Sequence, residues 1–230
     1  MEKLVPLIFF FSFLIGENIE FNITFLGINS ASVFISEKDT VINGKNAKSI
    51  IFETQTVAGV KTLFPVDNYY HTIINEKFNR ILYFNKQTSQ PWVKNNFSAK
   101  MKNGIIKYEN SEIEIQSGYQ NIFTLLQYLN HISINELIKS DYLIDREGLH
   151  YLASFELINS NDHYNEIQLF LHPINSIKNI PIVKNTDIFT WEVFKENSER
   201  ILRINKKTGK LIYCEFSSGI VTMKANLIEN

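Results

Sequence analysis

The residues of this chain that could perform acid–base or metal chemistry are its histidines, and their spacing matches no known site. They are His71, His131, His150, His163 and His172. The chain has no HExxH pair, and no histidine has a cysteine close by in sequence, so the local signature of a zinc site is missing. We therefore predict no metal site and no cofactor.

Three weaker patterns each have a chemical and a structural interpretation. His150 and His172 occupy the polar phase of two expected strands, where they form either an acid–base pair or part of a solvated sheet face. Asp67 stands four residues before His71 and could orient its imidazole, although chance also supplies such pairs. Lys207-Thr208-Gly209 matches a triplet of serine β-lactamases, but the chain has no Ser-x-x-Lys to supply the nucleophile. A hairpin turn explains that triplet better.

Motifs for nucleotide binding and for standard hydrolases are missing from the sequence. It contains no G-x-S-x-G, no G-x-G-x-x-G and no P-loop. The formal net charge of −1 argues against a broad surface for phosphate or nucleic acid. We therefore predict that the protein is not an enzyme, that it has no catalytic residues, and that it binds neither nucleotide nor nucleic acid.

The elements that carry these residues are expected to be mainly β-strands. Strict alternation of apolar and polar residues, which places one set of side chains on a buried face, recurs at 21–25, 112–116, 150–157 and 167–172. Further runs at 49–56, 69–75, 80–85, 104–109, 188–195, 200–204, 211–216 and 220–227 bring the expected total to about 11 to 13 strands. Glycine-containing turns at 43–44, 103–104, 208–209 and 218–219 predict hairpins between neighbours. We therefore expect a large curved antiparallel sheet or half-open barrel.

One segment has the period of a helix. From Asn121 to Ile132 the apolar residues recur at intervals of three and four, which predicts an amphipathic helix packed in or across the sheet. A short second helix is plausible around Ile134 to Lys139. The single cysteine, Cys214, lies in an apolar run and cannot form an internal disulfide, so we expect it to be a buried small hydrophobe rather than a reactive thiol.

The first sixteen residues predict export. Lys3 precedes an apolar run of about a dozen residues that ends at Gly16, which is typical of a signal peptide and too short to span a membrane. We expect residues 17–230 to form a single domain in the periplasm of a Gram-negative-type bacterium. Because Leu14 stands where a small residue is preferred for cleavage, an uncleaved leader that tethers the domain to the inner membrane stays an alternative.

After the leader, the chain resembles a known exported family. Phe21 to Ala31 is similar to that family's opening strand with its Gly-Ile and small residues, and Ile122 to Leu129 to its single mid-chain helix. The end of the chain, from Thr190-Trp191-Glu192-Val193 to Gly219 through Leu227, is similar to its closing hairpins. On these packing patterns the chain resembles the exported bacterial domain of unknown function 3108 (DUF3108). It departs from the pattern at Gln120-Asn121, where an acidic residue is usual, and in lacking a proline around 210–212.

The DUF3108 family in turn resembles, at the level of the fold, the lipoprotein-localisation factors LolA and LolB. Their antiparallel half-barrel closes around a helix and holds acyl chains. That resemblance is an analogy, and a shared fold does not fix function.

Two functions are compatible with these observations. In the first, the curved sheet and the helix leave a groove for a lipid or other hydrophobic ligand, lined by Phe123 and Leu126 of the helix and by Phe189 and Trp191 of the expected strand 188–195. In the second, the helix fills the sheet completely, and an outer face or edge strand binds another protein of the cell envelope. Trp191 is either a ligand contact or ordinary core. We prefer the first, a non-catalytic binding protein, in which membrane contact arises only through an uncleaved leader.

Overall fold

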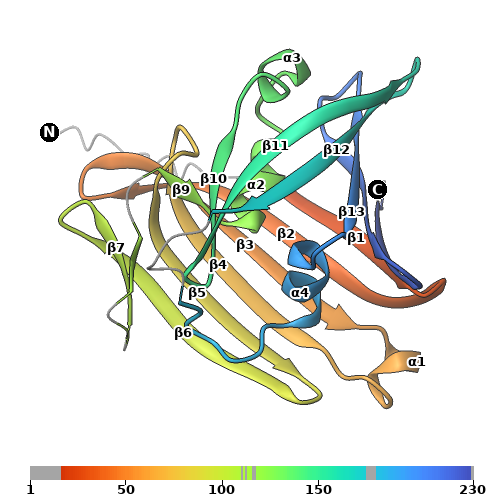
Figure 1. Ribbon diagram of the computed structural model, residues 1–230, viewed down its shortest axis with the longest axis horizontal. Helices are drawn as coiled ribbons and strands as arrows, with labels where there is room; N and C mark the ends of the chain where they lie inside the picture. The colour runs from red at the N-terminus through yellow and green to blue at the C-terminus, as the bar shows by residue number, and fades with distance from the viewer. Residues whose placement is uncertain (1–16, 110, 112, 116–117, 175–179, 229–230) are drawn as a thin grey trace, which may run out of the picture.

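The computed structural model describes residues 17–109, 111, 113–115, 118–174 and 180–228, so the expected leader at 1–16 lies outside the described residues. The described chain forms one 15-stranded sheet with short helices (Figure 1). The strands are β1 Glu17–Phe25, β2 Ile28–Ile42, β3 Lys45–Thr56, β4 Asp67–Asn75, β5 Ile81–Gln90, β6 Val93–Lys102, β7 Ile105–Tyr108, β8 Glu114–Ile115, β9 Tyr119–Gln120, β10 Tyr142–Arg146, β11 Leu149–Ser160, β12 Tyr164–Pro173, β13 Glu199–Asn205, β14 Leu211–Ser218 and β15 Val221–Leu227. The helices are α1 Ala58–Lys61, α2 Ile122–Tyr128, α3 Ile134–Leu137 and α4 Ile188–Phe194.

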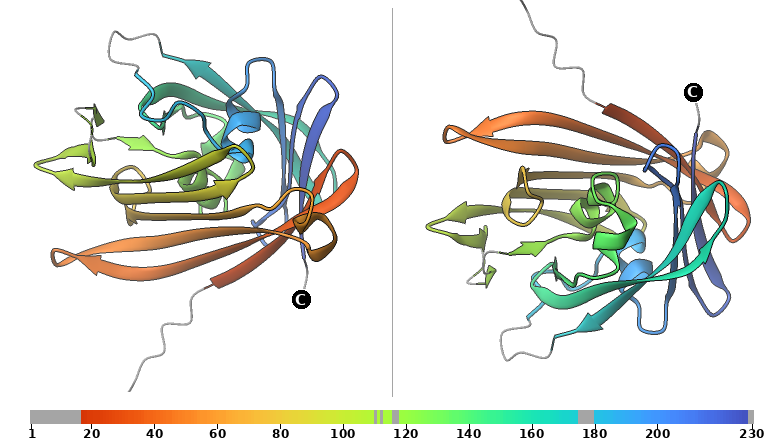
Figure 2. Two further views of the ribbon diagram at one scale, coloured as in Figure 1. Left: turned by 90° about the horizontal axis from the view of Figure 1, so that it is seen from below. Right: turned by 90° about the horizontal axis from the view of Figure 1, so that it is seen from above.

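The sheet is a half-open barrel built almost wholly from antiparallel neighbours. Its order is β8-β7-β6-β5-β4-β3-β2-β1-β15-β14-β13-β12-β11-β10-β9, and among the described strands only the β9–β10 pair is parallel. The sheet curls so that its two arms face each other across the helices α2 and α4 (Figure 2). This confirms the predicted mainly β, curved architecture. The strand count exceeds the predicted 11 to 13 partly because the two edge strands, β8 and β9, have only two residues each.

The hairpin turns form where the sequence predicts them. In the β2–β3 turn, Asn43 and Gly44 have φ values of 50° and 73°, and in the β6–β7 turn Asn103 and Gly104 have 53° and 82°. Positive φ at both central residues gives a turn whose twist matches that of the flanking strands. Asparagine and glycine adopt this conformation with the least strain, so these two pairs fix the register of the long hairpins.

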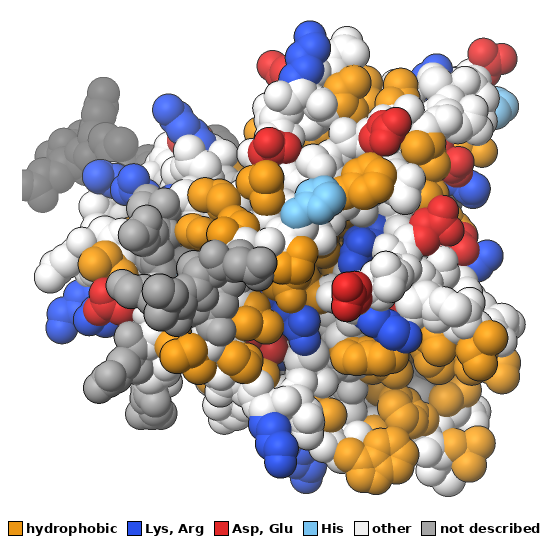
Figure 3. Space-filling model, viewed as in Figure 1, with side chains coloured by type: hydrophobic (Ala, Val, Ile, Leu, Met, Phe, Trp, Pro, Cys, Tyr) orange, Lys and Arg blue, Asp and Glu red, His pale blue; other side chains and the backbone are white. Residues whose placement is uncertain are grey.

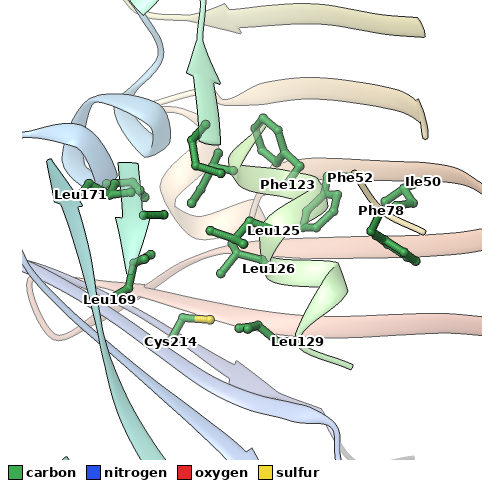
Figure 4. Close-up of a cluster of buried hydrophobic side chains, with 14 of the residues drawn as sticks. Ile50, Phe52, Phe78, Phe123, Leu125, Leu126, Leu129, Leu169, Leu171 and Cys214 are labelled. Atoms are coloured by element: carbon green, nitrogen blue, oxygen red, sulfur yellow. The ribbon is translucent and has the colours of Figure 1, made fainter. Parts of the chain in front are cut away.

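The helix α2 lies inside the curve of the sheet. It begins where the amphipathic helix was predicted, but it ends at Tyr128 rather than at Ile132. Asn121 caps it: its side chain accepts a hydrogen bond from the Thr124 backbone N–H at 2.9 Å, and the Thr124 hydroxyl accepts one from the Asn121 backbone N–H at 3.1 Å. Residues Ile122 to Gln127 are all buried, because the sheet surrounds the helix on several sides. Figure 4 shows side chains of α2 between side chains from the two arms of the sheet, and Cys214 belongs to one of these arms. That cysteine is buried and free, as predicted.

The segment predicted as strand 188–195 is a helix, so that prediction is wrong. Asp187 caps α4 by accepting a hydrogen bond from the Thr190 backbone N–H at 2.9 Å. Arg200 closes the other end, with its guanidinium donating to the backbone oxygens of Val193 at 2.5 Å and Lys195 at 2.9 Å. The local capping and the packing of one helical face inside the barrel outweigh the apparent two-residue alternation. In consequence Phe189 and Trp191 do not share one face of a strand.

Candidate functional site

A cavity of about 320 Å³ lies between the concave face of the sheet and the helices α2 and α4. Its walls come from β1 to β4, β14 and β15, together with the loop that carries α1. The lining is almost wholly apolar and contains no Asp, Glu, Lys, Arg or His among the described residues. The volume falls within the range of small-molecule sites, about 300 to 1,000 Å³.

Three of the four residues predicted to line a groove lie on this cavity. Phe123 and Leu126 project from α2, and Phe189 projects from α4. The Phe123 ring stacks on Tyr70 with centroids 4.1 Å apart and lies 5.6 Å from the Phe189 ring. Together these aromatic rings form one wall of the cavity.

Trp191 is not part of the cavity lining. It lies on the outer side of α4, is 42% exposed, and packs under the Lys195 ammonium, which stands 4.4 Å from the ring centroid. The helical conformation accounts for this position, because two residues of separation turn a helical side chain by about 200° from Phe189.

Most of the polar groups on the cavity wall are paired within the protein. The Thr56 hydroxyl bonds to the backbone of Phe64 and Val66. The Gln127 amide donates to Glu37 at 2.6 Å and accepts from Asn130 at 3.2 Å. Internal pairing of this kind leaves the cavity an apolar surface for a ligand.

A second feature, which sequence reasoning missed, is a buried charge cluster next to the cavity. Lys86 of β5 is 1% exposed, and its ammonium pairs with the carboxylates of Glu147 and Asp187. The hydroxyls of Thr186 and Thr190 lie 3.1 and 3.3 Å from the same nitrogen. Burial opposes ionisation of Asp187, but the Lys86 charge outweighs it and lowers the pKa of this carboxyl. The cluster joins β5, the β10–β11 turn and the start of α4.

A buried acid–phenol pair bridges the two arms of the barrel. The Tyr108 hydroxyl of β7 donates to Asp145 of β10, and burial raises the pKa of Asp145 to about 7. His150 Nε2 lies 3.6 Å from the other oxygen of Asp145. His172 is exposed and stacks on the Phe170 ring instead. The structure therefore does not bring His150 and His172 together with an acidic residue.

A third polar cluster holds α2 and the turn after it against the sheet. Glu37 of β2 is buried and bonds to Lys48 at 3.0 Å and to His131 at 2.9 Å. Burial alone would raise the pKa of Glu37, but the hydrogen bonds that it accepts outweigh this effect and lower the pKa to about 2.

The remaining chemical patterns of the sequence have structural roles. The His71 ring bonds to the Ser49 hydroxyl at 2.9 Å, and Asp67 is exposed on the outside of β4. Gly209 lies in the β13–β14 turn, where its N–H bonds to the Asn205 oxygen at 2.8 Å. Within the described residues, no group of three or more His, Cys, Asp or Glu could hold a metal ion. No helix in the described part of the chain is long and apolar enough to cross a membrane.

Exposed apolar side chains gather on the loops at one end of the barrel. Leu63 follows α1, Trp92 lies between β5 and β6, and Ile220 lies between β14 and β15, with exposed fractions of 85%, 90% and 92%. The Trp92 ring is 6.3 Å from that of Phe64, which lines the cavity. Figure 3 shows apolar side chains gathered in the lower right part of the view, where Figure 1 draws α1.

Fold and site together define a mainly β, barrel-like protein with an internal apolar cavity. No family model matches the chain, and no curated protein does. Among solved structures, the chain is similar to the crystal structure of a beta-barrel-like protein of domain of unknown function DUF1849 from Brucella abortus. The two share 8% sequence identity over 94% of this chain and 97% of that one, with a TM-score of 0.49. This likeness concerns the fold alone.

Proposed function

We propose that the protein is an exported, non-catalytic binding protein that carries a lipid or another hydrophobic molecule in the cavity of its half-barrel. It acts in the periplasm, and its relationship to DUF3108 and to half-barrels of the LolA and LolB kind is part of this proposal. The observation that carries it is the cavity of about 320 Å³, whose described lining has no charged side chain.

The energetics of such a cavity support an occupant. The cavity opens to solvent, so its apolar lining stays in contact with water until a ligand covers it, and covering that surface is favourable by about 25 cal/mol per Å² of apolar area. Apolar voids do not gain much from water, because water needs polar partners. An apolar ligand would restore the missing contacts and raise the unfolding temperature.

The test is a fluorescence titration with the apolar probe N-phenyl-1-naphthylamine. Val33 lines the cavity from β2, and its neighbour Phe34 points to the outer face with 45% exposure. Val33→Trp fills the cavity and is expected to abolish probe binding, whereas Phe34→Trp adds the same indole outside and leaves binding unchanged. Equal binding by the two variants would contradict a ligand site inside the barrel.

The second candidate is a structural protein that binds another envelope protein. The exposed side chains of Leu63, Trp92 and Ile220 favour it, because large apolar groups on loop tips are common at protein contacts. The edges of the sheet do not favour this second candidate, because the edge strands β8 and β9 are too short to pair with a strand of another protein. Under this alternative, Val33→Trp and Phe34→Trp behave alike in the probe titration.

A further inference from the structure

Asn68 is a buried polar residue on the cavity wall. It lies on β4, is 2% exposed, and its side-chain oxygen Oδ1 has no hydrogen-bond partner among the described residues. The Asn68 amide lies beside the Tyr70 hydroxyl, which is also close to the Asp187 carboxylate. A buried acceptor costs free energy until a donor reaches it, so Oδ1 marks a place for a donor group.

Asn68 shares this property with the Tyr70 hydroxyl beside it, which is also buried on the cavity wall without a hydrogen-bond partner among the described residues, so a ligand hydroxyl could donate to Oδ1 and accept from Tyr70. The other polar side chains nearby differ from this pair. Thr56, Gln127 and Asn130 also line the cavity, but each is bonded to other protein groups. Thr54, the residue of β3 directly opposite Asn68, is only partly buried. The unpaired oxygen therefore sits at one polar corner of an otherwise apolar chamber.

The charges behind this corner disfavour an anion. The neighbouring cluster has two carboxylates, Glu147 and Asp187, against the single ammonium of Lys86, and all three side chains are almost completely buried. No cationic side chain lines the cavity among the described residues. A ligand carboxylate or phosphate would find no counter-charge and would face net negative charge in a medium that screens poorly.

We propose that the cavity selects amphiphiles with an uncharged, hydroxyl-bearing head, and that this hydroxyl donates to Asn68 Oδ1 while the apolar tail packs against Phe123 and Phe189. A long-chain alcohol and a monoacylglycerol share this chemistry. The inference rests on the proposed function and adds the class of ligand.

The experiment measures displacement of N-phenyl-1-naphthylamine by four ligands of equal chain length at pH 8: decan-1-ol, 1-monodecanoylglycerol, decyl methyl ether and decanoate. The ether has an acceptor but no donor, and decanoate is an anion. The alcohol is expected to displace the probe at a concentration about tenfold lower than the ether, since a site with an unpaired acceptor discriminates against a ligand that lacks the donor. Decanoate is expected to be weaker still, and the order of the two hydroxyl ligands identifies the better head.

Variants separate the Asn68 contact from general hydrophobicity. Asn68→Leu is expected to bring the alcohol and the ether to the same affinity. If this variant fails to fold, Asn68→Ser replaces it in the experiment. The serine side chain is shorter, and we expect the same loss of discrimination. Thr54→Val changes the opposite cavity residue and is expected to keep the tenfold difference.

The outcomes distinguish the two levels of the proposal. If the alcohol and the ether are equal in the unmodified protein, or if their ratio survives in both Asn68 variants, the head-group assignment is wrong although the cavity still binds ligands. If the probe does not bind and no ligand raises the unfolding temperature, the proposed function itself is wrong, and this inference falls with it.

Discussion

Replacing Lys86 by methionine tests whether the buried cluster is held together by this one cation. Lys86 is 1% exposed, and the change leaves the Glu147 and Asp187 carboxylates, 6% and 0% exposed at their side chains, without their cation. Removing one partner of a buried ion pair typically costs about 3 to 5 kcal/mol, because the other charge stays buried and uncompensated. We expect a loss in this range at pH 8, measured by urea unfolding at equilibrium.

The loss should also depend on pH with a defined sign. In the unmodified protein Lys86 outweighs burial and lowers the pKa of Asp187, so this carboxyl stays ionised. Without Lys86, burial dominates and raises the pKa, and the folded variant binds protons that the unfolded chain does not. The free energy of unfolding of the variant therefore rises as pH falls from 8 to 5, and it comes closer to that of the unmodified protein.

The matched control is Lys100→Met, which breaks the Lys100–Glu109 pair on the outer surface, where the side chains are 62% and 49% exposed. We expect no measurable change in stability, because exposed pairs contribute little. If Lys86→Met were as mild as this control, or if its cost were the same at pH 5 and pH 8, the account of the cluster would be refuted.

Two further predictions concern two other buried carboxyls, those of Asp145 and Glu37. Burial raises the pKa of Asp145 in the folded protein to about 7 from an ordinary 3.8, so the folded protein retains a proton that the unfolded chain loses. The free energy of unfolding should therefore fall as pH rises from about 4 to about 7. Urea titrations of Asp145→Asn should no longer show this fall. Because the pKa of Glu37 is lowered from 4.5 to about 2, its contribution is present above pH 4.5 and disappears as pH falls toward 2. Glu37→Gln should cost about 2 kcal/mol at neutral pH and make acid unfolding less steep, and an unchanged acid transition would contradict the assignment.

Much of the fold could be predicted from local patterns. Alternation identified strands such as 150–157, and the Asn-Gly pairs at 43–44 and 103–104 identified hairpins whose backbone needs positive φ. The start of α2 followed from its period of three and four. These signals are local because each depends only on neighbours within one element.

The segment 188–194 shows where local patterns fail. Over seven residues, the spacing of Phe189, Trp191 and Val193 fits a strand, and the same residues fit a helix once Asp187 acts as its cap. The combination of Asp187 with Thr190 was the available signal for the helix. For this reason Trp191 was predicted to line the groove, although it lies on the outer side of α4.

The candidate site needed the tertiary structure. Lys86 is separated from Glu147 by 61 residues, and only the register of the sheet brings them together. The alternation of Phe84, Lys86 and Thr88 in β5 places this lysine on the inner face of the sheet, so a buried lysine could have been predicted from the sequence. The cavity itself depends on how the side chains of several strands and two helices fill space together, and no pattern within one segment reports that.

The most direct test of the central claim is native mass spectrometry, with organic extraction, of the protein purified without detergent from the cells that make it. We predict a bound hydrophobic molecule at about one per chain in the unmodified protein and in Phe34→Trp, and none in Val33→Trp. Repeated recovery of the unmodified protein without any bound hydrophobic molecule would contradict the claim that this half-barrel is a carrier.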